Sequence, residues 1–244
     1  MFSCENDHSN TIEYFATDQN REQIAGKLEK AYQKNSLSDL KEILDNWHQY
    51  YDHNNYALLT EIEKEVYSIY RAFYQPFTLE NIGDSEWGND IYENIEFLII
   101  QNRLVYDFSY NLSNVFPGDT IYNFRPYIYF DQADILYKSH KYEGAIYDFL
   151  GTDFPVKFNE YKLSEYNDVD KRWKFLSNYI KIYYGHWGGY WHINTHPEVD
   201  RISLNDRMDK AKVYFRLVYQ GGEAELEKIN NQWKLIDSQL TWIE

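Results

Sequence analysis

The feature that most constrains the fold is the alternation of apolar and polar residues in "AKVYFRLVYQ", residues 211–220. A period of two is typical of a β-strand that buries only one face. The face predicted to be buried consists of Ala211, Val213, Phe215, Leu217 and Tyr219. A strand of this kind requires neighbouring strands, and the residues around it supply them.

Two turn signals follow this strand. Gly221-Gly222 predicts the first turn and Asn230-Asn231 the second, because both residue types adopt positive φ at low cost. The stretch between them, "EAELEKI", also alternates and places its glutamates toward solvent. A strand near residues 199–204 and a closing strand from residue 232 complete an antiparallel meander, with Trp233 and Leu235 facing inward.

Three stretches in the first part of the chain have a helical period instead. The first begins at Thr17 or Asp18, the second at Ser36 or Ser38, and the third spans residues 58–74 before Pro76. We therefore expect a flexible tail over residues 1–16, a helical subdomain over residues 17–90 and an α+β domain over residues 91–244.

The middle of the chain mixes both patterns. "EFLIIQNRLVYDF" predicts a hairpin that turns at Gln101 and Asn102, and Pro126 keeps the next extended stretch away from a central strand. A helix is expected between Ser139 and Gly151, and a longer one over residues 164–184 that ends at Gly185. The predicted fold class is α+β, with an N-terminal helical part followed by an antiparallel sheet packed on helices.

The layout of the last 80 or so residues, from Ser164 to Glu244, resembles a cystatin-like arrangement. Its Asn-x-Trp-Lys-apolar turn, residues 231–235, is similar to that of the nuclear-transport-factor-like superfamily. This resemblance implies a curved sheet that wraps around helices and closes a cone-shaped pocket. It implies no single function, because that superfamily contains both enzymes and ligand-binding modules.

The whole chain also resembles uncharacterised envelope lipoproteins of the Bacteroidetes kind, through "MFSC", "FYQPF", "EWGND", "FRP" and "YYGHWGGYWHI". In a lipoprotein signal a small residue precedes the lipidated cysteine, as Ser3 precedes Cys4. We therefore expect a lipid anchor at Cys4 and an envelope location if an apolar stretch precedes Met1. Otherwise we expect a cytoplasmic protein in which Cys4 is incidental.

Net charge narrows the range of partners. The formal charge of −15 disfavours nucleic acid and anionic lipid, and we see no basic stripe that would override it. Membrane contact is expected only through a lipid at Cys4. The expected partners are an unknown small molecule or glycan, or a protein. We expect no cofactor, because no phosphate loop or dinucleotide fingerprint is present.

The densest group of chemically active side chains lies in "YYGHWGGYWHINTHP", residues 183–197. Its candidate ligand-binding residues are His186, Trp187, Tyr190, Trp191, His192 and His196, to which we add Arg125 of "NFRP". The histidines could hold a metal together with Glu198, but no metal signature is present, so we favour structural imidazoles and predict no metal. The rings are interpreted as a hydrophobic plug or as a platform for a sugar ring.

No catalytic residue can be assigned from the sequence. The acidic residues near turns or histidines are Asp119, Glu198, Asp200 and Asp206, among 39 acidic residues in all. The leading interpretation is a non-enzymatic binding or structural protein of the bacterial envelope. One alternative is a small-molecule enzyme with His186 or His192 as acid/base, and another is an acidic inhibitor or immunity-type protein for a basic partner.

Overall fold

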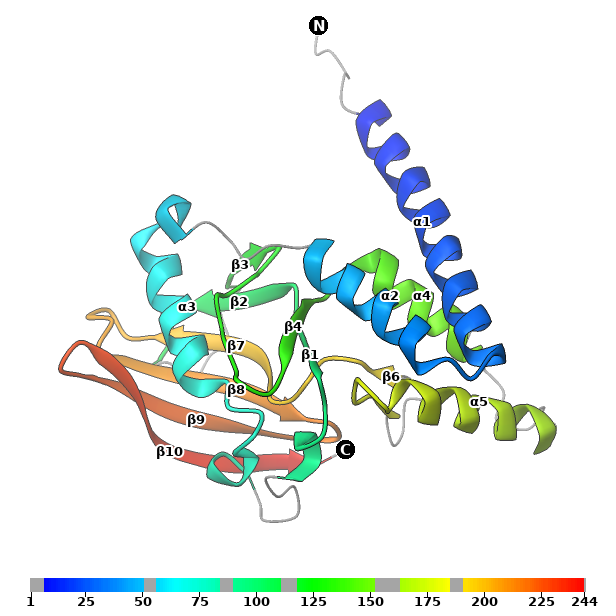
Figure 1. Ribbon diagram of the computed structural model, residues 1–244. Helices are drawn as coiled ribbons and strands as arrows, with labels where there is room; N and C mark the ends of the chain where they lie inside the picture. Colours follow the sequence, from blue (N-terminus) through cyan, green and yellow to red (C-terminus); the bar gives the residue numbers. More distant parts are fainter. Residues whose placement is uncertain are drawn as a thin grey trace, which may run out of the picture.

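The computed structural model describes residues 7–50, 56–83, 90–110, 118–151, 163–184 and 191–243 (Figure 1). The helices are α1 (Asp7–Gln33), α2 (Leu37–Tyr50), α3 (Glu61–Phe73), α4 (His140–Leu150) and α5 (Leu163–Leu176). Short 3-10 turns are η1 (Tyr56–Leu58), η2 (Leu79–Asn81) and η4 (Asp90–Tyr92). The strands are β1 (Phe97–Ile100), β2 (Arg103–Asp107), β3 (Asp119–Tyr122), β4 (Asp134–Tyr137), β5 (Tyr183–Tyr184), β6 (Trp191–His192), β7 (Glu198–Leu204), β8 (Lys210–Leu217), β9 (Gln220–Ile229) and β10 (Gln232–Ile243).

The main sheet has, in the described residues, six strands in the order β10-β9-β8-β7-β2-β3. Strands β2 and β7 pair in parallel, and every other neighbouring pair in this sheet is antiparallel. Helix α3 packs against β10 and β7. We call the side of the sheet opposite α3 the outer face. The predicted α+β fold class is confirmed, with a mostly antiparallel sheet in the C-terminal part.

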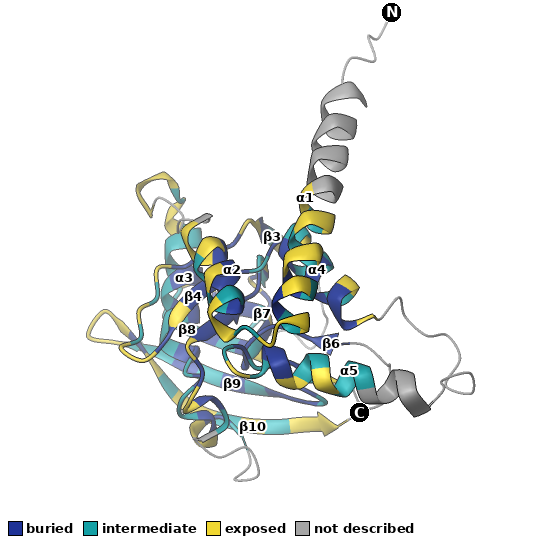
Figure 2. Ribbon diagram, turned by 45° about the vertical axis from the view of Figure 1, so that its right-hand side comes forward, coloured by how far each residue is buried: buried dark blue, intermediate teal, exposed yellow. Residues whose placement is uncertain are grey.

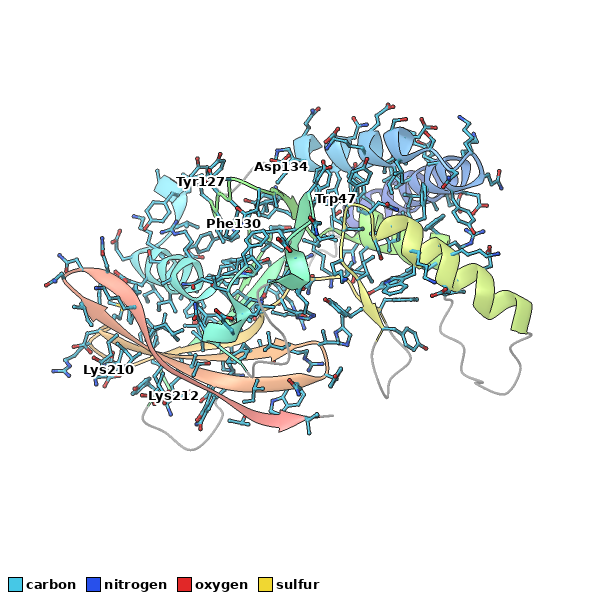
Figure 3. All side chains as sticks on the ribbon, turned by 60° about the horizontal axis from the view of Figure 1, so that its bottom comes forward. Trp47, Tyr127, Phe130, Asp134, Lys210 and Lys212 are labelled. Carbon is cyan, nitrogen blue, oxygen red and sulfur yellow. The ribbon has the colours of Figure 1, made fainter. Side chains whose placement is uncertain are left out.

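Buried apolar side chains form two cores. The buried residues are dark blue on the ribbon in Figure 2. The sheet core lies between α3 and the main sheet and contains Phe73, Phe124 and Phe215. The helical core collects side chains from α1, α2, α4 and α5, among them Trp47, which stacks on Tyr142 with ring centroids 4.6 Å apart. Figure 3 shows Trp47 among these helices, on the side away from the main sheet.

Strands β1 and β4 separate the two cores. They form a parallel two-stranded sheet, and all four residues of β1 are buried. Phe97 and Ile99 point into the helical core, while Leu98 and Ile100 point into the sheet core. A strand that is covered on both faces needs an apolar residue at every position, which explains the run "FLII".

The first three helices do not pack together as the single subdomain that we expected over residues 17–90. Helices α1 and α2 belong to the helical core, whereas the buried residues of α3 belong to the sheet core. Thr60 begins α3 with a capping box, in which its Oγ1 accepts from the Glu63 backbone N–H. Leu58, which we placed in this helix, lies in η1 and is exposed.

Two other helix boundaries differ from the prediction. Helix α1 begins at Asp7, so residues 7–16 are helical rather than a tail, and Thr17 and Asp18 lie inside the helix. Helix α5 ends at Leu176 rather than near Tyr184, which lies in β5. The apolar residues Ile180 and Ile182, which lie within the predicted helix range, are buried in the helical core from a non-helical segment. Gly185 lies outside the described residues.

The hairpin predicted at Gln101 and Asn102 is wrong, although both of its strands exist. Strand β1 pairs with β4, while β2 pairs with β3 and β7. The Gln101 side chain bridges the break: its Oε1 accepts from the Val199 N–H and its Nε2 donates to the Val199 carbonyl. This amide therefore pairs with β7 in the way that a strand residue would.

The turn predicted at Gly221-Gly222 is also wrong, because both glycines lie inside β9. Leu217 pairs with Gln220, so the chain reverses at Val218 and Tyr219, and Val218 adopts a φ of 56°. The turn at Asn230 and Asn231 is confirmed, with φ values of 51° and 61°. The predicted alternation is confirmed from Ala211 to Leu217, since Ala211, Val213, Phe215 and Leu217 are all buried. It breaks at the turn, where Val218 is buried and Tyr219, which was predicted to face inward, is only partly buried.

Candidate functional site

A β-bulge in β7 brings charged side chains together on the outer face. Glu198 pairs with Arg216 of β8, and the register then shifts between Val199 and Arg201, which leaves Asp200 as the extra residue. Bulges redirect side chains and are common beside functional sites. Glu198 and Arg216 are partly buried, and Asp200 is exposed.

These residues line a cavity of about 240 Å³. Its walls come from α4, β6 and the segments that follow β4 and β6 on one side, and from β7 and β8 on the other. The lining residues are Lys138, Tyr147, Trp191, His192, Ile193, Asn194, Glu198, Asp200 and Arg216. The cavity therefore lies where the helical core meets the outer face of the main sheet.

Buried hydrogen bonds fix the segment that carries most of these residues. The Thr195 N–H donates to the Ile99 carbonyl, and the Ile99 N–H donates to Thr195 Oγ1, both at 2.8 Å. The Gln101 amide holds Val199 in the same manner. Asn194 and Glu198 lie beside these two anchors, so their positions are set by β1 and by the residue that follows it.

Glu198 has an unusual electrostatic environment for a carboxylate. Its partial burial raises its pKa above the ordinary value, and the negative charge of Asp200 acts in the same direction. Lys138, Arg216 and a 2.6 Å hydrogen bond from Asn194 Nδ2 act in the opposite direction without cancelling the shift. Glu198 can therefore accept hydrogen bonds as a carboxylate, and it binds a proton more readily than a solvated glutamate does.

Two residues that line the cavity each carry a buried polar group for which the described part of the chain supplies no hydrogen-bond partner. These are the indole N–H of Trp191 and the side-chain oxygen Oδ1 of Asn194. The two residues are 7% and 5% exposed. A buried polar group without a partner costs about 1–3 kcal/mol, and both groups belong to residues that line this cavity, where a ligand or an ordered water that reached them would supply the missing hydrogen bonds.

Lys138 and Tyr147 are held by Glu143 of α4. Lys138 Nζ lies 2.8 Å from Glu143 Oε1, and the Tyr147 hydroxyl lies 3.3 Å from the same oxygen and from the Trp191 carbonyl. Burial raises the pKa of Tyr147, with the charge of Glu143 as the next cause, so its hydroxyl stays protonated. The wall contributed by α4 and by the short segment between β4 and α4 is therefore an ordered set of donors.

His196 lies outside the cavity lining, although His192 is part of it. Burial, together with the neighbouring His192, lowers the pKa of His196 to about 3. Its ring Nδ1 accepts from the Val218 N–H at 3.5 Å, and the backbone N–H of His196 donates to the Tyr92 hydroxyl at 3.0 Å. These hydrogen bonds connect η4, the residues just before β7 and the turn after β8. We therefore assign His196 a structural role.

The other predicted site residues are more dispersed. Trp191 and His192 line the cavity, whereas Arg125 does not. The backbone of Arg125 forms a hydrogen bond with the Tyr67 hydroxyl of α3. His186, Trp187, Tyr190 and Cys4 lie outside the described residues. The ring centroids of His192 and His196 are 6.3 Å apart, and no group of three or more metal-ligating side chains occurs in the described part of the chain.

Sequence reasoning missed Lys138, Tyr147 and Arg216 as members of the site. Arg216 was visible only as one polar position in the alternation of β8, and its pairing with Glu198 depends on the register of two strands. Lys138 and Tyr147 come from a segment about 50 residues earlier, and no local pattern distinguishes them from other surface lysines and tyrosines. Glu198 and Asp200 were noted as acidic candidates, but the bulge that makes Asp200 an extra residue in β7 could not be predicted.

Two larger grooves are more open than this cavity. One of about 700 Å³ lies between α3 and β10, and one of about 580 Å³ lies between α1 and α5. None of the sequence candidates lines either groove. We therefore place the candidate site at the smaller cavity, where buried polar groups converge.

The fold and the cavity together describe an α+β protein with a small cavity whose lining is polar and partly aromatic. Comparison with protein-family models, with curated proteins and with solved structures finds no match. The lipoprotein and cystatin-like resemblances therefore stay predictions. No described helix is both long enough and apolar enough to cross a membrane.

Proposed function

We propose that this protein binds a small polyhydroxylated ligand, about the size of one sugar ring, in the cavity between β6 and β7. The observation that carries the proposal is the pair of unpartnered buried groups, Trp191 Nε1 and Asn194 Oδ1, which belong to two residues that line one cavity. A hydroxyl group both donates and accepts hydrogen bonds. Neighbouring hydroxyls on one ring can therefore satisfy both groups.

The size and charge of the cavity support the same class of ligand. At about 240 Å³ it is smaller than the ~300–1,000 Å³ of most drug-sized sites. Its cations, Lys138 and Arg216, are matched by Glu198 and Asp200, so the lining favours neither a strong anion nor a strong cation. Trp191 and Tyr147 add aromatic surface, which suits the apolar face of a sugar ring.

The proposal is tested with a panel of D-glucose, D-galactose, N-acetyl-D-glucosamine and D-glucuronate, using saturation-transfer NMR and calorimetry. We expect at least one of these sugars to bind with a dissociation constant of about 1 mM or less. Asn194→Leu removes the buried acceptor and should weaken binding about tenfold. Asn46→Leu on α2 is the matched control. Absence of binding of all four sugars at about 10 mM would overturn the proposal.

A second candidate function is acid/base chemistry on the bound ligand. The raised pKa of Glu198 favours it, because a general acid must hold its proton near the working pH. His196 is too deeply buried to take this role, and it lies outside the cavity lining. Turnover of p-nitrophenyl glycosides by the wild type but not by Glu198→Gln would support an enzyme. Sugar binding without turnover would leave the binding role alone.

We also propose an envelope location through a lipid at Cys4, on the strength of the "MFSC" resemblance. The gene with its upstream region, expressed in a bacterial host, should then incorporate a palmitate analogue, and Cys4→Ser should abolish that label. Label that persists in Cys4→Ser would contradict the proposal. We likewise propose a cystatin-like relationship for the C-terminal part, on the strength of the antiparallel layout of β7 to β10.

A further inference from the structure

One row of residues crosses the outer face of the main sheet from the cavity to the edge strand. Glu198 pairs with Arg216, Arg216 pairs with Gly221, and Gly221 pairs with Trp242. Directly paired residues in antiparallel strands share a face of the sheet. The row therefore joins β7, β8, β9 and β10. In Figures 1 and 2 the C-terminal end of β10 lies at the end of the sheet nearest to β6.

Gly221 makes this row continuous. A Cβ atom at this position would lie 2.1 Å from Cε2 and Cζ2 of Trp242, far closer than atoms can approach. The indole therefore occupies the space that any other residue at 221 would fill. The glycine is required by this close approach and not by a turn, since it lies within β9.

The indole in turn contacts the side chain on the other side of the glycine. The guanidinium carbon of Arg216 lies 5.2 Å from the centre of the Trp242 ring system, within the range of a cation–π interaction. Arg216 also lines the cavity, beside Glu198. Trp242 does not line the cavity and is 39% exposed. An edge-strand tryptophan is thus connected to the site through one arginine.

We propose that Trp242 is a positioning residue of the ligand site: lying across Gly221, it holds the Arg216 guanidinium at the cavity, where Arg216 donates hydrogen bonds to the bound ligand. The ligand role of Arg216 rests on the proposed function, whereas the contact between the two side chains does not. An arginine has a planar fork of donors that is useful to a ligand only when its orientation is fixed. Stacking on an indole fixes that orientation through the face of the guanidinium plane, and the stacking itself uses none of the N–H donors.

The first test needs no ligand, because the pKa of Glu198 reports on the position of the Arg216 guanidinium. The positive charge of Arg216 is one of the influences that lower the pKa of Glu198 against the effect of burial. Trp242→Ala should release the guanidinium, so the pKa of Glu198 should rise further, as followed by 13C NMR of the glutamate carboxyl carbons. Trp242→Phe keeps a ring and should stay close to wild type. Glu198→Gln assigns the signal.

Gly221→Ala tests the same contact from the glycine side. Its methyl group must displace the indole, so the pKa of Glu198 should shift as in Trp242→Ala. If Gly221→Ala fails to fold, Trp242→Leu replaces it, since an exposed edge position tolerates leucine. An unchanged pKa of Glu198 in folded Trp242→Ala would overturn the positioning role.

The second test uses the four sugars named above as probes in a double-mutant cycle. Trp242→Ala should weaken binding about two- to fivefold, as expected for the loss of one exposed cation–π contact. In an Arg216→Ala background the same change should weaken binding no further. Additive losses would show that Trp242 contacts the sugar itself and would overturn the proposal. If no sugar binds, the proposed function fails, while the NMR titration still decides whether Trp242 positions Arg216.

Discussion

Individual polar side chains make connections in this protein that the backbone does not. Gln101 stands where β1 ends and β2 begins, and its amide forms a complete donor and acceptor pair with Val199. Thr195 does the same for Ile99 with its backbone N–H and hydroxyl. These residues hold the segment between β6 and β7 against β1, so the geometry of the cavity depends on side chains that do not line it.

The buried carboxylate of Asp107 provides a prediction on pH dependence. Burial alone raises the pKa of Asp107, but hydrogen bonds from Ser109, Ser203 and Arg201 outweigh burial and hold the pKa below its ordinary value. An acid with a lowered folded-state pKa stabilises the fold above its unfolded pKa of about 3.9, and this contribution is lost as the pH falls toward the folded value.

Asp107→Asn should therefore be clearly less stable than wild type at pH 7, because Arg201 loses the carboxylate 2.5 Å away. The difference should shrink below about pH 4, where the wild-type carboxylate begins to be protonated. Urea denaturation at a series of pH values measures both effects. Asp131→Asn, at an exposed position, is the control and should stay within about 0.5 kcal/mol. A difference in stability that does not change with pH would contradict a lowered pKa of Asp107 in the folded protein.

The elements that were predicted correctly are those whose pattern is read within one segment. The alternation in β8 and the Asn230-Asn231 turn are examples, because period and turn chemistry are local properties. Helix α4, from its N-cap Ser139 to Gly151 in the left-handed conformation, was predicted for the same reason. The lysines of β8 also behave as the pattern requires: Figure 3 shows Lys210 and Lys212 on the outer face, where they pair with Glu227 and Glu225.

The errors arise where a residue has a partner far away in the sequence. Gly221-Gly222 looks like a turn, but each glycine is required by close approach of β10: Gly221 by the Trp242 ring and Gly222 by the Gln239 carbonyl. The real turn uses Val218, which local rules would not choose at a φ of 56°. The membership of the cavity was unpredictable for the same reason, since Lys138, Trp191 and Arg216 come from three separate elements.

Gly222→Ala tests this explanation of the glycines. A Cβ atom would lie 2.2 Å from the Gln239 carbonyl oxygen and 2.9 Å from Phe215 Cζ, and the backbone of a paired strand cannot move away. We expect a loss of about 1–3 kcal/mol in the free energy of unfolding, as for other overpacked sites. Gly26→Ala in α1 has nothing within 4 Å and should instead stabilise by about 0.5–1 kcal/mol. Similar effects of the two changes on the denaturation midpoint would contradict this explanation.

At the scale of the whole molecule, the two cores share a wall that is only two strands thick. Strand β1 sends Phe97 and Ile99 to the helical core and Leu98 and Ile100 to the sheet core, and β4 divides its residues in the same way. Neither core can lose this wall and remain closed. The candidate site lies at the same junction, so its geometry depends on both cores being folded.

This arrangement predicts that the two cores unfold together. Trp47 is buried in the helical core and Trp233 in the sheet core, so single-tryptophan fluorescence at each position reports on one core. The two denaturation curves should coincide, as required for a two-state transition. Ile99→Ala truncates a side chain of the helical core and should lower both midpoints together, by about 2–5 kcal/mol in unfolding free energy. Ile236→Ala, at an exposed position of β10, is the control. A lower midpoint for Trp47 alone would show that the helical core unfolds independently, and that the cavity can open without unfolding of the sheet.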